Sequence, residues 1–136
     1  MKVIVAGTIA IDDIKTPKEE RKGLMGGSAS YAAMSSSFFA PTEIVGIIGK
    51  DFPKNHIQTL ESREICTEGI EKSEGDSFYW SGEYHENMDN RTTHDVAINV
   101  LEAYDPKLPD KYQETEVVLL ANMSPRNQLD VLKQCH

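Results

Sequence analysis

A carboxylate near the start of the chain has the type and position to bind a polyhydroxylated ligand. Asp12 follows an apolar run, residues 3–6, that is typical of a strand buried on both faces of a parallel sheet. Ligands of α/β proteins bind at the carboxyl ends of such strands. One carboxylate can accept hydrogen bonds from two hydroxyl groups of a sugar. The alternative for Asp12 is a solvated turn residue or a cap.

Two further candidates lie at comparable points of the chain. Gly26 and Gly27 precede a stretch of small residues that begins at Ser28, so the backbone could approach a ligand closely and a helix start would offer free N–H donors. A plain tight turn before a helix is the alternative. Asn122 comes just past a later apolar run, and its amide could both donate to and accept from a hydroxyl group. An Asx turn ahead of Ser124 is the alternative there.

Aromatic side chains form a third group of candidates. Phe78, Trp80 and Tyr84 share one parity of an extended run, so they would lie on one face of a strand and could cover a sugar or base ring. The competing interpretation, for at least two of the three, is the packed face of a hairpin.

Metal and thiol chemistry have little support in the sequence. Each of the pairs at 85–86 and 94–95 combines a histidine with an acid, but nothing else at ligand spacing joins them, so we expect no metal site. Cys66 and Cys135 form no CxxC pair and have no base at a recognisable spacing. We therefore expect neither a disulfide framework nor a catalytic thiol.

The elements that would position these residues follow from the apolar pattern. Three buried parallel strands are predicted at residues 3–6, 44–48 and 117–121. Extended runs on both sides of the polar turn at 86–90 predict an antiparallel hairpin with one solvent-exposed side. Strands that alternate with helices, together with an inserted hairpin, predict an α/β fold.

Helix signals separate the predicted strands. One helix is expected over residues 28–40, between the glycine pair and Pro41, and a second after Pro53. A third follows the N-cap residue Ser124, and its Leu129 and Leu132 are expected to face inward.

Composition narrows the function classes. Among 136 residues, 22 acidic and 14 basic side chains give a net charge of −8, which disfavours non-specific binding to nucleic acid or to an anionic membrane. No apolar run approaches membrane-spanning length, and the first residues lack the pattern of a signal peptide. We expect no nucleic-acid partner, no membrane and a cytoplasmic location.

Four segments, in this order, resemble the start of ribokinase-like (PfkB) carbohydrate kinases. They are VIVAGTIAID at 3–12, LMGGSASYAA at 24–33, EIVGIIGKDFP at 43–53 and VVLLANMSP at 117–125. The second resembles the family's N-terminal signature, and the third resembles its V-G-x-V-G-x-D strand and turn. The resemblance implies the N-terminal part of a ribokinase-like, Rossmann-like three-layer α/β sandwich. It also implies a small inserted β-sheet lid, built from residues of about 12–24 and 70–99.

The resemblance also implies roles for individual residues. Asp12 matches the aspartate that binds sugar hydroxyls, and Gly26 and Gly27 match the glycines whose backbone contacts the sugar. The hairpin with Phe78, Trp80 and Tyr84 matches the lid, and Asn122 lies in a segment that supplies a further sugar contact.

Two features depart from the family pattern. Tyr31 stands where ribokinases carry an asparagine, which disfavours ribose itself as the substrate. The family's second signature, D-T-x-G-A-G-D, is absent, and family members are more than twice this length. We therefore expect no catalytic residue in this chain.

The expected function is ATP-dependent phosphorylation of a sugar or nucleoside hydroxyl, with this chain as a truncated, substrate-binding half. ATP and Mg²⁺ would act in the full-length protein and would not bind to this chain alone, which we expect to be inactive. A homodimer through the lid sheet is a further expectation. The alternative is a non-catalytic sugar-binding or dimerisation module. A dinucleotide-binding domain is disfavoured, because residues 7–12 contain no G-x-G-x-x-G.

Overall fold

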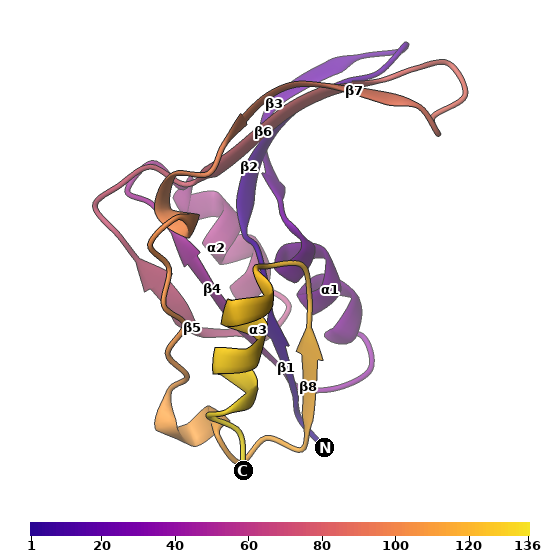
Figure 1. The fold of residues 1–136 in the computed structure, drawn as a ribbon. Helices are drawn as coiled ribbons and strands as arrows, with labels where there is room; N and C mark the ends of the chain where they lie inside the picture. Colours follow the sequence, from indigo (N-terminus) through magenta and orange to yellow (C-terminus); the bar gives the residue numbers. More distant parts are fainter.

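A parallel sheet of four strands forms the centre of the computed structural model, which describes residues 1–136 (Figure 1). The strands are β1 (Val3–Ala6), β4 (Thr42–Ile48), β5 (Cys66–Lys72) and β8 (Val117–Leu120), in the order β5-β4-β1-β8. All three predicted strands are present, and their mutual parallel pairing is confirmed. The strand β5 was not predicted.

Helices cover both faces of this sheet, which gives three layers. α1 (Ser28–Ser36) and α2 (Lys54–Glu61) lie on one face, where Val5, Ile44 and Leu60 are fully buried. α3 (Pro125–Leu132) lies on the other face and packs Val131 against the sheet. The predicted three-layer α/β fold is confirmed. No helix of the structure is long and apolar enough to cross a membrane.

A second sheet projects as a curved arm from the carboxyl edge of the central strands (Figure 1). Its strands are β3 (Glu20–Gly26), β2 (Ala10–Lys15), β6 (Phe78–Tyr84) and β7 (Arg91–Ala97), in the order β3-β2-β6-β7. We call it the lid sheet. The expected hairpin is β6 and β7, which pair antiparallel.

The expected lid boundaries require one correction. Residues 70–72 belong to β5 in the central sheet, so the second lid segment begins at Phe78 and not near 70. β5 has a mixed polar pattern because it is the outermost strand of its sheet. Only Gly69 and Ile70 of this strand are buried, so the strand lacks the continuous apolar run of an internal strand.

The strand β8 and the helix α3 also differ from expectation. β8 is an edge strand, and Val117 and Leu119 are 39% and 42% exposed because no helix covers their side of it. On α3, Leu129 and Leu132 point outward, whereas Asn127 and Val131 are buried. These two residues are four positions apart, so they share the face of α3 that packs on the sheet.

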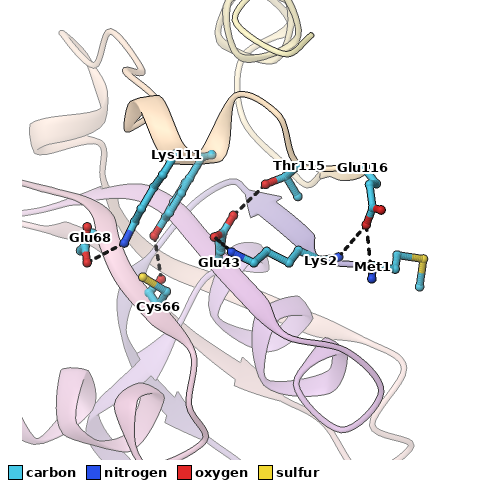
Figure 2. Close-up of polar contacts among 9 residues, drawn as sticks. Met1, Lys2, Glu43, Cys66, Glu68, Lys111, Thr115 and Glu116 are labelled. Atoms are coloured by element: carbon cyan, nitrogen blue, oxygen red, sulfur yellow. Dashed lines mark hydrogen bonds and ion pairs between the residues drawn. The ribbon is translucent and has the colours of Figure 1, made fainter.

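Contacts at the amino ends of the strands tie the segment before β8 to the sheet (Figure 2). The hydroxyl of Thr115 donates to the buried carboxylate of Glu43 on β4 over 2.9 Å, and Lys2 lies 3.4 Å from the same carboxylate. The fully buried Tyr112 donates its hydroxyl to the Cys66 carbonyl oxygen at 3.2 Å. These contacts therefore stabilise the end of the central sheet that lies opposite to the lid.

Candidate functional site

A pocket of about 390 Å³ lies between the carboxyl edge of the central sheet and the lid sheet. Its walls come from the β1–β2 connection, β2, the start of α1, the lid strands β6 and β7, and the turn after β8. Binding sites for small molecules typically measure about 300–1,000 Å³, and those of parallel sheets lie at this edge. The pocket is therefore the candidate functional site.

The structure places most of the predicted site residues on this one pocket. The predicted residues that line it are Asp12, Gly27, Phe78, Trp80, Tyr84 and Asn122. Gly26 does not line the pocket. It is buried next to Asp12, so that a side chain at this position would collide with the Asp12 carboxylate. Further lining residues that sequence reasoning did not place there are Thr8, Ala10, Ile14, Ser28, Tyr31 and Arg91.

The start of α1 is closed by hydrogen bonds within the chain. The N–H of Ser28 donates to Thr8 Oγ1 over 3.1 Å, and the N–H of Ala29 donates to the Thr8 carbonyl oxygen over 2.9 Å. The expectation that the helix start offers free N–H donors is therefore wrong for these two groups. Thr8 occupies them because Gly27, at φ +92°, turns the chain so tightly that a side chain there would collide with the Thr8 carbonyl.

The same turn brings β8 into the site. The backbone carbonyl of Asn122 accepts hydrogen bonds from the N–H of Thr8 at 3.1 Å and from the hydroxyl of Ser28 at 3.2 Å. Both bonds fix the backbone after β8, so the Asn122 side chain lines the pocket. The cluster forms where the end of β1, the start of α1 and the turn after β8 meet, and no local motif signals it.

Asp12 is the acidic group of the pocket. It lies on β2, half-buried, and no hydrogen bond within the chain offsets the cost of burying its charge. Burial from solvent, together with the neighbouring charge of Asp13, raises the pKa of Asp12 to about 6. Because no group of the chain bonds to it, the Asp12 carboxylate is free to accept hydrogen bonds from the hydroxyl groups of a ligand.

Aromatic rings face the pocket from the lid and from α1. The rings of Trp80 and Tyr84 are 6.3 Å apart and tilted, and the Trp80 indole N–H donates to Thr93 Oγ1 at 3.3 Å. Tyr31, on the first turn of α1, is 63% exposed. Burial, followed by the charge of Asp12, raises the pKa of Tyr31. Rings on both sides of one pocket could enclose a planar or ring-shaped ligand.

The histidines of the lid do not combine into a metal centre. His85 contacts the Thr92 hydroxyl at 2.8 Å, whereas His94 lies 3.3 Å from the Glu83 carboxylate. No group of three or more His, Cys, Asp or Glu side chains is arranged to hold a metal ion. Cys66 and Cys135 are both free thiols.

The sequence and the fold were compared with those of known proteins. The chain matches no protein-family model. It is 27% identical to a cytidine kinase of Thermococcus kodakarensis, over 98% of this chain and 48% of that protein. Its fold matches a nucleoside kinase of Methanocaldococcus jannaschii described as an archaeal member of the ribokinase family, with a TM-score of 0.71, 18% identity, and coverage of 99% and 49%. It also matches a Halothermothrix orenii fructokinase, with a TM-score of 0.69, 15% identity, and coverage of 98% and 53%.

The chain has the fold of the ribokinase family, and over nearly its whole length its sequence resembles that of a cytidine kinase. The two solved structures establish the ribokinase-like fold, and the sequence relative matches nearly all of this chain. The chain spans about half the length of the relatives that it matches.

Proposed function

We propose that this chain is the substrate-binding half, with its lid, of an ATP-dependent kinase that phosphorylates a hydroxyl group of a sugar or nucleoside. The observation that carries the proposal is the Asp12 carboxylate, which lies without a hydrogen-bond partner in a pocket beneath an aromatic lid. Two adjacent hydroxyl groups of one ligand can both donate to its oxygens.

The aromatic residues favour a nucleoside among these substrates. Tyr31 lies on the α1 side of the pocket, and Trp80 and Tyr84 lie on the lid side. A nucleobase offers a planar surface for such rings, and a pocket of about 390 Å³ has room for a base as well as a ribose. The cytidine kinase relative supports the same choice.

Phosphoryl transfer requires groups that this chain does not provide. The N–H groups of Ser28 and Ala29 are bonded to Thr8, so they are not available to a phosphate. We therefore assign to the residues of this chain only the binding and orientation of the acceptor hydroxyl, and the binding of ATP and Mg²⁺ to the full-length protein. Groups that stabilise the transferring phosphoryl would lie outside these 136 residues.

Trp80 provides a direct test, because it is the chain's single tryptophan. Titration with cytidine, ribose and fructose should change its fluorescence, with cytidine binding most tightly. Asp12→Ala should weaken binding at least about tenfold, since each charge-assisted hydrogen bond contributes about 1.5–3 kcal/mol. Glu114→Ala removes an exposed acid outside the pocket and should leave binding unchanged. Equal affinity of Asp12→Ala and the unchanged chain would refute the assignment.

A non-catalytic binding module is the second candidate, because the carboxylate of Asp12 and the aromatic rings of Trp80 and Tyr84 line one pocket. Both candidates require ligand binding, and only a kinase requires turnover. Purified 136-residue chain should release no ADP from ATP with any of these ligands; substrate-dependent release would contradict our assignment of the phosphoryl-transfer groups. A downstream coding sequence with a GAGD-like segment would favour the kinase over the module.

A further inference from the structure

The lid sheet contains two β-bulges at the same level. Between β2 and β3, Asp13 alone faces two residues, Lys22 and Gly23, because Asp12 pairs with Leu24 and Ile14 pairs with Arg21. The outer strand β3 therefore carries one extra residue at this level. Gly23 adopts φ +66°, as the glycine of one common bulge type does.

The other outer strand has the matching irregularity. Ser81 pairs with Asp95 and Gly82 pairs with Thr93, which leaves His94 as the extra residue of β7. The inner strands β2 and β6 pair in parallel without interruption, with Asp13 opposite Ser81. The two bulges are thus aligned across the sheet. Bulges bend strands, and the lid sheet is visibly curved (Figure 1).

This bend lies between two groups of pocket residues. Asp12, Phe78 and Trp80 come before it, on the part of the lid next to the central sheet. Tyr84 and Arg91 come after it, on the part that extends outward. The angle of the bend therefore determines how Tyr84 and Arg91 lie over the pocket relative to Asp12.

Asp13 connects the β3 bulge to β6 through its two carboxylate oxygens. Oδ1 accepts from the N–H of Gly23 over 2.8 Å, and Oδ2 accepts from the hydroxyl of Tyr79 over 2.9 Å. The carbonyl of Gly23 lies 2.8 Å from His56 Nε2 on α2. Because a carbonyl only accepts, His56 Nε2 carries the hydrogen. These bonds connect the lid strands β6, β2 and β3, in that order, to α2, a helix that covers one face of the central sheet.

We propose that Asp13 is a positioning residue, which fixes the bend of the lid and so sets Tyr84 and Arg91 over the ligand bound at Asp12. Asp13 faces away from the pocket, so it acts on the ligand only through this hydrogen-bonded chain. The inference rests on the proposed function for its effect on ligand affinity. Its structural part, the support of the bend, stands independently of any ligand.

The structural part is tested by hydrogen exchange and near-ultraviolet circular dichroism on the whole chain. In Asp13→Ala, the Gly23 amide should exchange at least about tenfold faster, because its acceptor is lost. The dichroism of the neighbouring Trp80 and Tyr84 rings should weaken as their geometry loosens. Asp13→Asn keeps one carbonyl acceptor for Gly23 and should restore most of both signals. Unchanged exchange and dichroism in Asp13→Ala would overturn the proposal.

The ligand part uses cytidine and Trp80 fluorescence. Asp13→Ala should raise the Kd for cytidine about tenfold, and Asp13→Asn should raise it by no more than about threefold. Tyr79→Phe removes a single hydroxyl, cannot disrupt folding by loss of bulk, and should give an intermediate value. Glu114→Ala is the matched control. Equal affinity of Asp13→Ala and the unchanged chain would overturn the positioning role.

Failure of the proposed function looks different from failure of this inference. If the unchanged chain binds none of cytidine, ribose and fructose, the proposed function fails, while the exchange and dichroism signals still decide whether Asp13 holds the bend. If the unchanged chain binds cytidine and the Asp13 variants bind equally well, only the inference fails.

Discussion

The side-chain oxygen of Ser77 accepts a hydrogen bond from the backbone N–H of Gly49 over 2.8 Å. Ser77 is fully buried at the base of the lid, and its own N–H donates to Asp51 Oδ1, also over 2.8 Å. Its carbonyl accepts from Asn99 Nδ2 at 2.9 Å. The turn after β4 therefore holds both the strand that enters the lid hairpin and the segment that leaves it. Residues 49–51 of this turn do not line the candidate pocket, so their contribution is structural.

Replacement of Ser77 should loosen this attachment. Ser77→Ala leaves the N–H of Gly49 buried without an acceptor, which costs about 1–3 kcal/mol of the free energy of unfolding. Urea denaturation followed by circular dichroism measures the loss. Ser73→Ala is the control, because the exposed Ser73 hydroxyl bonds Gly75 at 3.3 Å where water can replace it. Equal stability of both variants would show that the Ser77 bond carries no net energy.

Gly27 should tolerate no side chain. Its backbone conformation, φ +92° and ψ 149°, is accessible almost only to glycine, and the conformation alone would cost alanine about 1–3 kcal/mol. Collision with the Thr8 carbonyl adds to this cost. Gly27→Ala should therefore lower the melting temperature clearly more than Gly75→Ala, whose added carbon would meet side-chain atoms alone, Val100 Cγ1 at 3.2 Å and Ser73 Oγ at 3.8 Å. Similar melting temperatures of the two variants would contradict the strained turn.

Loss of the Ser30 hydroxyl should make the protein more stable. Its side chain is 2% exposed on the inner face of α1, and its oxygen has no hydrogen-bond partner. Ser30→Ala removes this unsatisfied group and raises helix propensity, so the free energy of unfolding should rise by about 1–2 kcal/mol. Thermal denaturation checks the sign. A lower melting temperature for Ser30→Ala would mean that the hydroxyl has a partner in solution.

The sequence contains enough to place the internal strands and the main pocket residues. The runs that became β1 and β4 are apolar on both faces because both strands are internal, and burial on two faces is what such runs indicate. Asp12 and Asn122 could be placed at one sheet edge because parallel strands share the direction of their ends. Where burial is one-sided the same logic fails: the edge strand β5 was not predicted, and the predicted strand β8 is buried on one face only.

What could not be predicted depends on register between distant segments. Thr8 closes the start of α1 only because β1, α1 and the turn after β8 meet there, and none of these contacts is local. The bond from Tyr79 to Asp13 likewise spans 66 positions of the chain. Leu129 and Leu132 follow the spacing of a buried stripe, but the orientation of α3 buries Val131 in their place. Helix spacing defines a stripe and does not say which stripe a sheet will cover.

The ionised carboxylate of Asp12 should lower the free energy of unfolding at neutral pH, although the proposed ligand binding needs it. Its pKa is about 6 in the folded chain against 3.8 as the ordinary value, because burial and the charge of Asp13 oppose ionisation. The folded state therefore holds the proton more tightly than the unfolded state, so this group stabilises folding at low pH. That stabilisation decreases as the pH rises from about 4 to about 6, and it is absent above that range.

Asp12→Asn removes this charge with almost no change of shape. At pH 8 its free energy of unfolding should exceed that of the unchanged chain by on the order of 1–3 kcal/mol, and the difference should disappear at pH 3.5. Ligand affinity should show the opposite preference, because the ionised carboxylate is the acceptor. In the unchanged chain, affinity for cytidine should fall about tenfold between pH 7 and pH 5 as Asp12 gains a proton, and in Asp12→Asn it should be weak and independent of pH. Denaturation and Trp80 titrations at several pH values measure both effects. A stability difference that grows toward low pH would contradict the raised pKa of Asp12.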